Sequence, residues 1–309
     1  MILNEFSPVI DRSRRRFINN LAKIAGPAVL LSAPVKGFAG NFFMPAETWT
    51  VGQIMDQFIK EVPGAPFEKT VDTLKSGSRD AKVTGIVTTM FPTIEIIQKA
   101  ISAGANFIIC HEPSFYNHLD ETDWLKNDEV FNYKMDLLKK HGITIWRNHD
   151  YIHRHTPDGV LTGVVARLQW EKYFDKKENI IVFNRAISLQ TLIGEVKTKL
   201  GISTLRYIGD LSQKCRNILL LPGAYGGRLQ ISITSTKKPD TLICGEISEW
   251  ETAEYIRDAN AKGQKITLLI LGHVASEEPG SIYMAEWLRK KFPGVKVTHI
   301  PSENPLSFL

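Results

Sequence analysis

The chain has 309 residues, of which 43% are hydrophobic and 23% charged, and its formal net charge is +5. This length predicts two domains, since a single domain is usually about 150 residues, and the composition is that of a globular enzyme with a large core. Three cysteines (Cys110, Cys215 and Cys244) are too few to form a disulfide framework.

Residues 1–39 have the pattern of an export signal. Arg14, Arg15 and Arg16 precede Phe17 and Ile18, an apolar segment follows, and small residues end the segment near Ala39. This pattern indicates a twin-arginine signal and a periplasmic or otherwise exported protein; the alternative is a disordered basic tail. The apolar segment is shorter than the roughly 20 residues that span a bilayer, so we expect no stable membrane insertion.

The positive charge belongs mainly to this segment. Residues 1–39 contain six Lys or Arg and two Asp or Glu, which leaves 32 basic and 31 acidic residues, a net +1, in the rest of the chain. We therefore expect no nucleic-acid partner.

Residues 40–174 are predicted to form an N-terminal α/β domain. Residues 48–51 resemble a strand, and Ile54, Phe58 and Val62 then have helical spacing. Further strands are expected over 82–90, 107–110 and 143–146, with helices over 94–103, 119–142 and 158–174. The order strand, helix, strand is typical of βαβ units in parallel sheets.

Residues 175–309 are predicted to form a second α/β domain. One strand is expected to begin at residue 179 and a second to end near Gly209, and further strands are expected over 217–221, 241–244, 266–271 and 295–300. Helices are expected to begin at the cap Ser188 and at Ser281. The glycine-rich residues 222–227 do not match GxGxxG and are interpreted as a tight turn. The predicted fold class is α/β, with two domains built on mostly parallel sheets.

Histidines and carboxylates follow the predicted strands. Apolar strands of this kind are buried in parallel sheets, and ligands bind at their carboxyl ends, so we expect a metal site in the crevice between the domains. His149 taken alone is interpreted as a loop residue or as a support for a ligand. The residues concerned are His111 and Glu112; His149, Asp150, His153 and His155; Glu246 and Glu249; and His273 and Glu277.

Mixed histidine and carboxylate ligands favour Zn, Mn, Fe or Co over calcium. His273 and Glu277 stand four residues apart, so both point at one spot if a helix begins directly after the strand. A carboxylate can bridge two cations that share one activated water. The pattern therefore predicts a site for divalent metal ions.

Several motifs resemble the NIF-three-like proteins, also called GTP-cyclohydrolase-I-type-2-like dinuclear metal-centre proteins. They are GIVTTM (85–90), ANFIICHEPSFY (105–116), SLQTLIGEVKTKLG (188–201), RYIGD (206–210) and LGHVASEEPG (271–280). The resemblance implies two divalent metal ions between two α/β domains and a ring-shaped homo-oligomer, commonly a hexamer.

The resemblance also implies a ligand set. His111, His273 and Glu277 match the family pattern directly, whereas Glu112 replaces a second histidine and His153 replaces an aspartate. The expected metal ligands are therefore His111, Glu112, His153, His273 and Glu277, with Glu277 as the bridging ligand.

These features lead to a first functional hypothesis. We expect an exported hydrolase in which metal-bound hydroxide attacks a small substrate, such as a phosphoester or a cyclic amide. Asp150, Glu246 or Glu249 is expected to act as the catalytic base. The alternative is a metal-binding scaffold without turnover, whose ring serves as a platform for partners.

Overall fold

The computed structural model describes residues 48–307 and residue 309. The predicted export signal and its cleavage position near Ala39 lie outside these residues. No described helix combines the length and the hydrophobicity needed to cross a bilayer. The elements are α2 (Val51–Ile59), β1 (Leu74–Ser76), β2 (Ile86–Thr89), α3 (Ile94–Ser102), β3 (Phe107–Cys110), α4 (Glu129–Lys140), β4 (Thr144–Arg147), α5 (Asp150–Arg154), α6 (Gly159–Leu168), β5 (Phe174–Asp175), β6 (Ile180–Ser188), α7 (Leu189–Leu200), β7 (Arg206–Ile208), β8 (Lys214–Leu221), α8 (Gly227–Lys237), β9 (Thr241–Cys244), α9 (Glu254–Ala261), β10 (Thr267–Ile270), α10 (His273–Lys291) and β11 (Val297–His299).

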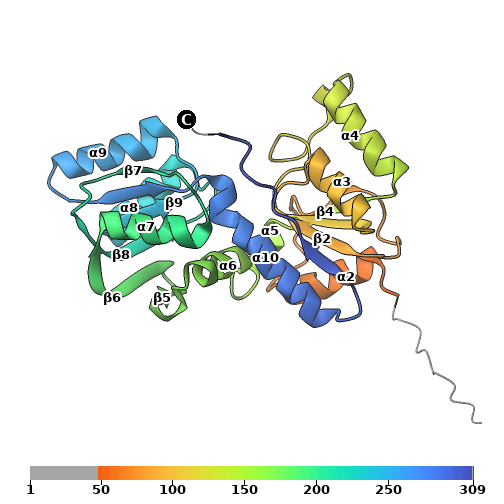
Figure 1. Cartoon of the computed structure of the whole chain (residues 1–309), viewed down its shortest axis with the longest axis horizontal. Coiled ribbons are helices and arrows are strands. Elements are labelled where there is room, and N and C mark those ends of the chain that lie inside the picture. The colour runs from red at the N-terminus through yellow and green to blue at the C-terminus, as the bar shows by residue number, and fades with distance from the viewer. Residues whose placement is uncertain (1–47, 308) are drawn as a thin grey trace, which may run out of the picture. The chain divides into compact units, whose positions relative to one another are not determined.

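The first sheet has the strand order β1-β4-β3-β2-β11. All neighbours in it are parallel except β1, which is antiparallel to β4. Side chains alternate across β3, so Phe107 and Ile109 join one hydrophobic core while Ile108 and Cys110 join another. Helix α2 packs on the first face and α3 and α4 on the second (Figure 1). The strand predicted over residues 107–110 is confirmed.

The second sheet has the order β5-β6-β8-β9-β10-β7. Strands β8, β9 and β10 are parallel, whereas β5, β6 and β7 pair antiparallel with their neighbours. The prediction of mostly parallel sheets is therefore confirmed for the first sheet and wrong for the second. Four residues join β5 to β6, and a connection this short allows only an antiparallel hairpin.

Helices α6 and α10 cross closely within a core that contains residues of both sheets, such as Phe107 and Leu269. Glycine permits this approach, because a Cβ atom at Gly163 would lie 2.2 Å from the carbonyl oxygen of Pro279. After α10 the chain returns to the first sheet, where β11 pairs with β2. The domain boundary near residue 175 stays a prediction.

Several expected elements differ from the structure in their bounds. Residue Val51 begins α2 rather than ending a strand, because Thr50 and Gln53 form a capping box. Helix α4 begins only at Glu129, where Asp128 accepts a hydrogen bond from a backbone N–H of the first turn. Helix α10 begins at His273 instead of Ser281, so the strand end and the helix meet directly.

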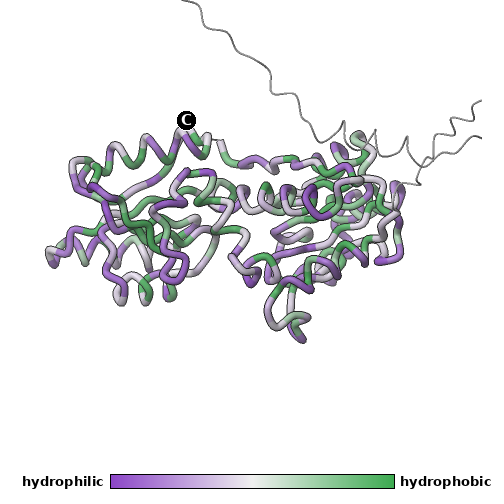
Figure 2. Tube along the Cα trace, turned by 90° about the horizontal axis from the view of Figure 1, so that it is seen from below, coloured by the Kyte–Doolittle hydropathy of each residue, from purple (hydrophilic) through white to green (hydrophobic). Residues whose placement is uncertain are grey.

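Both hydrophobic and hydrophilic residues are interspersed along the helices (Figure 2).

Candidate metal centre

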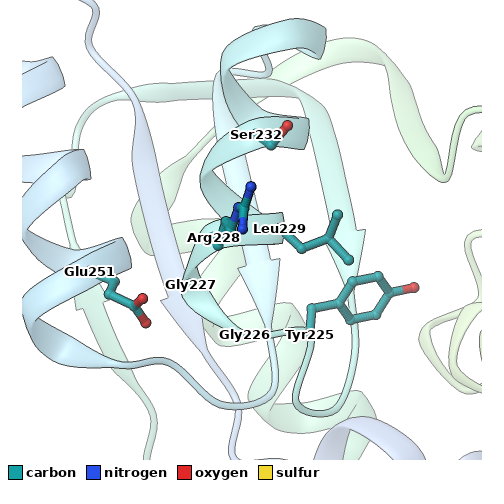
Figure 3. A pocket seen from close by; sticks show the side chains of 7 residues that line it. All are labelled: Tyr225, Gly226, Gly227, Arg228, Leu229, Ser232 and Glu251. Carbon is teal, nitrogen blue, oxygen red and sulfur yellow. The ribbon is translucent and has the colours of Figure 1, made fainter.

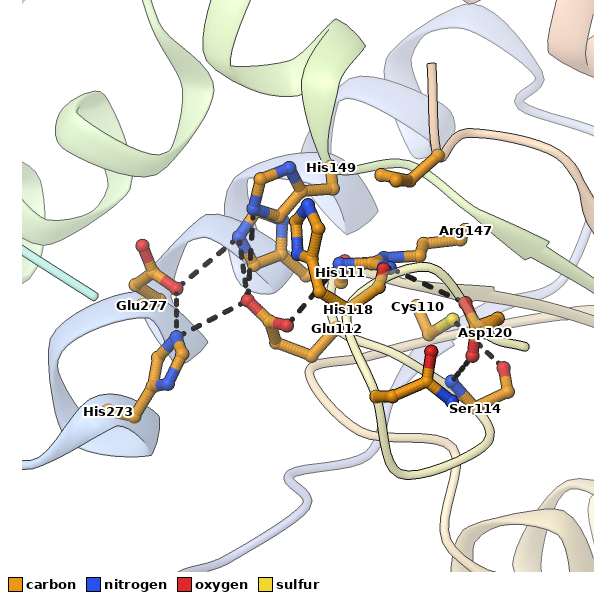
Figure 4. A network of polar contacts seen from close by, with 12 residues as sticks. Cys110, His111, Glu112, Ser114, His118, Asp120, Arg147, His149, His273 and Glu277 are labelled. Atoms are coloured by element: carbon orange, nitrogen blue, oxygen red, sulfur yellow. Dashed lines mark hydrogen bonds and ion pairs between the residues drawn. The ribbon is translucent and has the colours of Figure 1, made fainter. Parts of the chain in front are cut away.

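Four histidine rings and two carboxylates face one another where β3, β4 and α10 meet. Figure 4 labels His111, His149, His273, Glu112 and Glu277 among them, and the fourth ring is that of His153 on α5. The Nε2 atom of His273 lies 2.9 Å from Glu277 Oε2 and 3.3 Å from Glu112 Oε1. His111 Nε2 lies 3.4 Å from the same oxygen of Glu277. The remaining two rings reach the carboxylates at 3.9 Å, from His149 Nε2 to Glu112 Oε1 and from His153 Nε2 to Glu277 Oε1.

Backbone geometry brings these side chains together. His111 and Glu112 directly follow β3, and the N–H of Glu112 donates to Met90 O at 2.9 Å, which turns the chain at the edge of the sheet. Gly272, at φ 86°, lets α10 begin immediately after β10. His273 and Glu277 then lie one helical turn apart on the same face.

Each of the four rings has a hydrogen-bond acceptor at Nδ1. An acceptor at that atom makes Nδ1 the donor of the neutral ring and leaves the Nε2 lone pair toward the centre of the cluster. Metal-bound histidines in proteins show this arrangement. The acceptors are Asn148 O for His111 (3.4 Å), Asp150 Oδ1 for His149 (3.0 Å), Asp158 Oδ2 for His153 (3.2 Å) and Glu246 Oε1 for His273 (2.9 Å).

His111 Nε2 shows that the cluster fits a metal ion. This atom is buried and has no hydrogen-bond partner, and a buried polar atom without a partner is costly. Two groups of three residues could each hold an ion, because the ligand atoms within each group all lie within 4.8 Å of one another. Both groups include His111; they are His111, His149 and His153, and His111, Glu112 and Glu277. A divalent cation would satisfy the free Nε2 lone pair and neutralise the buried carboxylates.

Both carboxylates favour the charged form. Burial alone would raise the pKa of Glu112, but the hydrogen bond from His273 and the neighbouring histidine charges lower that pKa to about 2. Burial opposes ionisation of Glu277 in the same way, but the nearby His111 charge, the hydrogen bond from His273 and the His153 charge together outweigh burial and lower its pKa. Burial also disfavours the charged His273 ring, yet its hydrogen bonds to the surrounding carboxylates raise its pKa to about 12. The cluster therefore requires positive charge, from protons or from metal ions.

A cleft of about 440 Å³ opens onto the cluster. A second cavity of about 400 Å³ adjoins it and shares Tyr225 with it (Figure 3). The glycine-rich turn forms part of the wall, because a Cβ atom at Gly223 would lie 2.1 Å from Glu277 Oε1. The cleft is lined by Glu112, His118, His149, His153, Asp158, Pro222, Ala224, Tyr225, His273 and Glu277.

The structure brings all five expected metal ligands together, whereas the three expected bases lie outside the set of candidate ligands. Asp150 and Glu246 contact the cluster only through the Nδ1 atoms of His149 and His273. Glu249 is exposed and pairs with Arg206, so the structure does not bring it to the cluster.

Sequence reasoning missed three contributors. His149 joins the candidate ligands, and its spacing of four from His153 was the available signal. Asp158 supports His153. The buried Asp72 accepts the backbone N–H groups of His149, Asp150 and Tyr151 at 2.7–2.9 Å, and no local pattern links it to them. His155 lies apart from the cluster, stacked on Phe58.

Comparison with known proteins identifies the family. Residues 67–305 match the model of the Duf34/NIF3 (NGG1p interacting factor 3) family. A GTP cyclohydrolase 1 type 2 homolog of Clostridium acetobutylicum is 24% identical over 226 residues, which cover 70% of this chain and 80% of the relative. The homolog of Chlamydia pneumoniae is 24% identical over 242 residues, which cover 75% of this chain and 89% of the relative.

Solved structures show the same fold. A Staphylococcus aureus protein superimposes with a TM-score of 0.68 at 17% identity, covering 84% of this chain and 99% of the other. A Bacillus cereus protein related to NIF3 superimposes with a TM-score of 0.68 at 14% identity, covering 85% of this chain and all of the other. The family match spans most of the chain, both sheets and the histidine and glutamate cluster, and the chain therefore belongs to the Duf34/NIF3 family.

Proposed function

We propose that this protein is a metal-dependent hydrolase of a small substrate and that its cluster holds two divalent ions, chosen from Zn, Mn, Fe and Co. The convergence of four Nε2 atoms, each on a ring whose Nδ1 has an acceptor, carries the proposal. If the cluster were only a structural hydrogen-bond network, the buried Nε2 of His111 should have a partner, but it has none.

The candidate ligands are His111, Glu112, His149, His153, His273 and Glu277. Two ions bound among these residues would activate a water molecule and polarise the bond that it attacks. Glu277 offers both oxygens to the cluster, Oε2 toward His111 and His273 and Oε1 toward His153. Glu277 would therefore help to hold both ions.

The carboxylates around the cluster orient the rings. Asp150 and Glu246 each accept a hydrogen bond at Nδ1 of a candidate ligand, which is a positioning role in this proposal. Glu246 is also half-exposed, with 55% of its side chain accessible, so it remains our candidate to receive a proton from water. Glu249, in its surface ion pair, takes no part.

The cleft limits the substrate to a small molecule. Its volume of about 440 Å³ lies at the lower end of the range for small-molecule sites. Burial raises the pKa of Tyr225 to about 12, so its hydroxyl stays protonated and can donate a hydrogen bond to substrate. We propose a phosphoester or a cyclic amide as the target bond. The relatives are named for GTP cyclohydrolase, but GTP is scarce in the exported compartment that we propose.

Metal analysis and a matched pair of variants test this proposal. Protein purified without chelator is expected to contain about two divalent ions per chain and to hydrolyse generic phosphoester or cyclic amide substrates. His273→Ala should lower the rate by about 100-fold or more. His141→Ala is the control, because His141 is exposed at the end of α4 and should leave the rate unchanged. Full activity in His273→Ala would refute the proposed site.

A scaffold function is the second candidate, and exposed apolar side chains favour it. Apolar residues on the segment around η1 (Asp123–Leu125) and on α4 have more than half of their surface accessible, and exposed apolar side chains are a common feature of surfaces that bind other proteins. A metal-loaded protein that is silent on every substrate would support this candidate. The exposed residues are Tyr116, Leu119, Trp124, Val130 and Tyr133.

Export and self-association complete the proposal. We propose that residues 1–39 direct the protein to the periplasm or beyond and that the mature chain forms a homo-oligomer such as a hexamer. Cell fractionation after changing Arg15 and Arg16 to Lys tests export, because the processed form should then disappear. Light scattering of the purified protein tests the oligomeric state, and a monomer at all concentrations would contradict it.

A further inference from the structure

Arg147 ends β4 and is completely buried beneath the cluster. Its Nε atom donates to His111 O at 3.2 Å, and its Nη1 atom donates to His118 O. Its Nη2 atom lies 3.5 Å from Glu112 Oε2 and has no hydrogen-bond partner. Because the side chain is inaccessible, Arg147 cannot bind substrate and must act on the residues around it (Figure 4).

The two oxygens of Glu112 have different surroundings. Oε1 faces the histidines, at 3.3 Å from His273 Nε2 and 3.9 Å from His149 Nε2. Oε2 faces the guanidinium of Arg147. In the low dielectric of the interior this charge holds Oε2 away from the centre of the cluster.

The guanidinium is itself held by a second carboxylate. Asp120, with 2% of its side chain exposed, lies 3.4 Å from Arg147 Nη1 and 3.1 Å from Lys75 Nζ. One Asp120 oxygen also accepts the backbone N–H groups of Ser114 and Phe115. Of the described carboxylates, Asp120 and Glu112 are the two within ion-pair distance of Arg147. Nε and Nη1 are thus held by other partners, and Nη2 is the atom that faces Glu112.

We propose that Arg147 is a positioning residue that makes Glu112 a one-oxygen ligand. This inference rests on the proposed metal centre. Oε1 would bind metal while Arg147 retains Oε2, so Glu112 would occupy a single coordination position and leave another for water or substrate. Arg147 would also withdraw charge from the carboxylate and keep the bound ions electrophilic.

Metal affinity provides a test that does not need activity. Arg147→Met, which preserves volume but removes charge and donors, should weaken Co²⁺ and Zn²⁺ binding by 10-fold to 100-fold in chelator competition. Arg147→Lys keeps the charge without the fork and should give an intermediate affinity. The Co²⁺ absorption spectrum should change in Arg147→Met, because Glu112 is then free to bind through both oxygens. Arg206→Met, which removes a surface ion pair, is the control and should match wild type.

A double-mutant cycle shows whether the effect passes through Glu112. In a Glu112→Ala background, Arg147→Met should change the affinity by less than about threefold. An equal loss in that background, or an unchanged affinity and spectrum in Arg147→Met alone, would overturn the inference. If Arg147→Met does not fold, Arg147→Lys carries the same cycle. Wild-type protein without metal would overturn both the centre and this role; metal-loaded protein without hydrolysis would overturn only the proposed reaction.

Discussion

The crossing of α6 and α10 makes a sharp prediction for Gly163→Ala. The new Cβ atom would lie 2.2 Å from the carbonyl oxygen and 2.6 Å from the carbonyl carbon of Pro279. Ordinary contacts begin near 3.4 Å, so the helices would have to separate by about 1.2 Å. Both obstructing atoms are backbone, and no side-chain rotation can relieve the clash.

The magnitude follows from two opposing effects. Overpacking costs about 1–3 kcal/mol, and the higher helix propensity of alanine returns up to about 1 kcal/mol. We expect Gly163→Ala to lower the free energy of unfolding by about 2 kcal/mol. Gly194→Ala in α7 is the matched control, because no heavy atom lies within 4 Å of its Cβ position, and it should stabilise by up to about 1 kcal/mol.

Urea denaturation of both variants measures the difference from the transition midpoints at constant slope. Metal affinity provides a second readout, because α10 carries His273 and Glu277 and a shifted helix should weaken binding. Equal stabilisation by Gly163→Ala and Gly194→Ala would refute the claimed close contact.

Three further predictions concern buried polar groups. Asp72→Ala removes the acceptor for three backbone N–H groups at the start of α5 and should cost about 2–4 kcal/mol in denaturant unfolding, with weaker metal binding through His149; a loss below about 0.5 kcal/mol would contradict the capping role. Ser276→Ala leaves the buried N–H of Gly223 without its acceptor, and we expect a loss of about 1–3 kcal/mol in the same assay, whereas an unchanged midpoint would argue against this link. Burial lowers the pKa of Lys134 from 10.5 to about 8. The unfolded chain therefore binds more protons between these values, so wild type should gain stability relative to Lys134→Met as the pH rises from about 8 to 10.5, by about 3 kcal/mol. Parallel pH profiles of the two proteins would disprove that shift.

Local sequence signals predicted the elements whose formation depends on residues within the element itself. The apolar residues 107–110 and 241–244 form strands with the predicted bounds, since a run of this composition is stable only when buried on both faces. Ser188 caps α7 as predicted, by accepting the Thr191 N–H. The four-residue spacing of His273 and Glu277 placed both on one face once the helix began at the strand end.

Signals were ambiguous where two local preferences compete. Residues 119–128 have helical spacing but lie outside α4, because the side chain of Asp128 caps the N-terminus of that helix. The mixed pairing of the second sheet was also not predictable from composition, since strand direction depends on connections and partners rather than on the strand itself.

The sequence by itself predicted the α/β class, because hydrophobic runs, caps and residue spacing act over a few positions. Its resemblance to the NIF-three-like proteins supplied the family and the candidate set His111, Glu112, His153, His273 and Glu277. Only the tertiary structure decided that β11 joins β2, that His149 belongs to the cluster, and that Arg147 and Asp72 support it from below. Those relations join segments far apart in the chain, and their energies come from burial and from hydrogen bonds that exist only after the sheets and α10 have packed together.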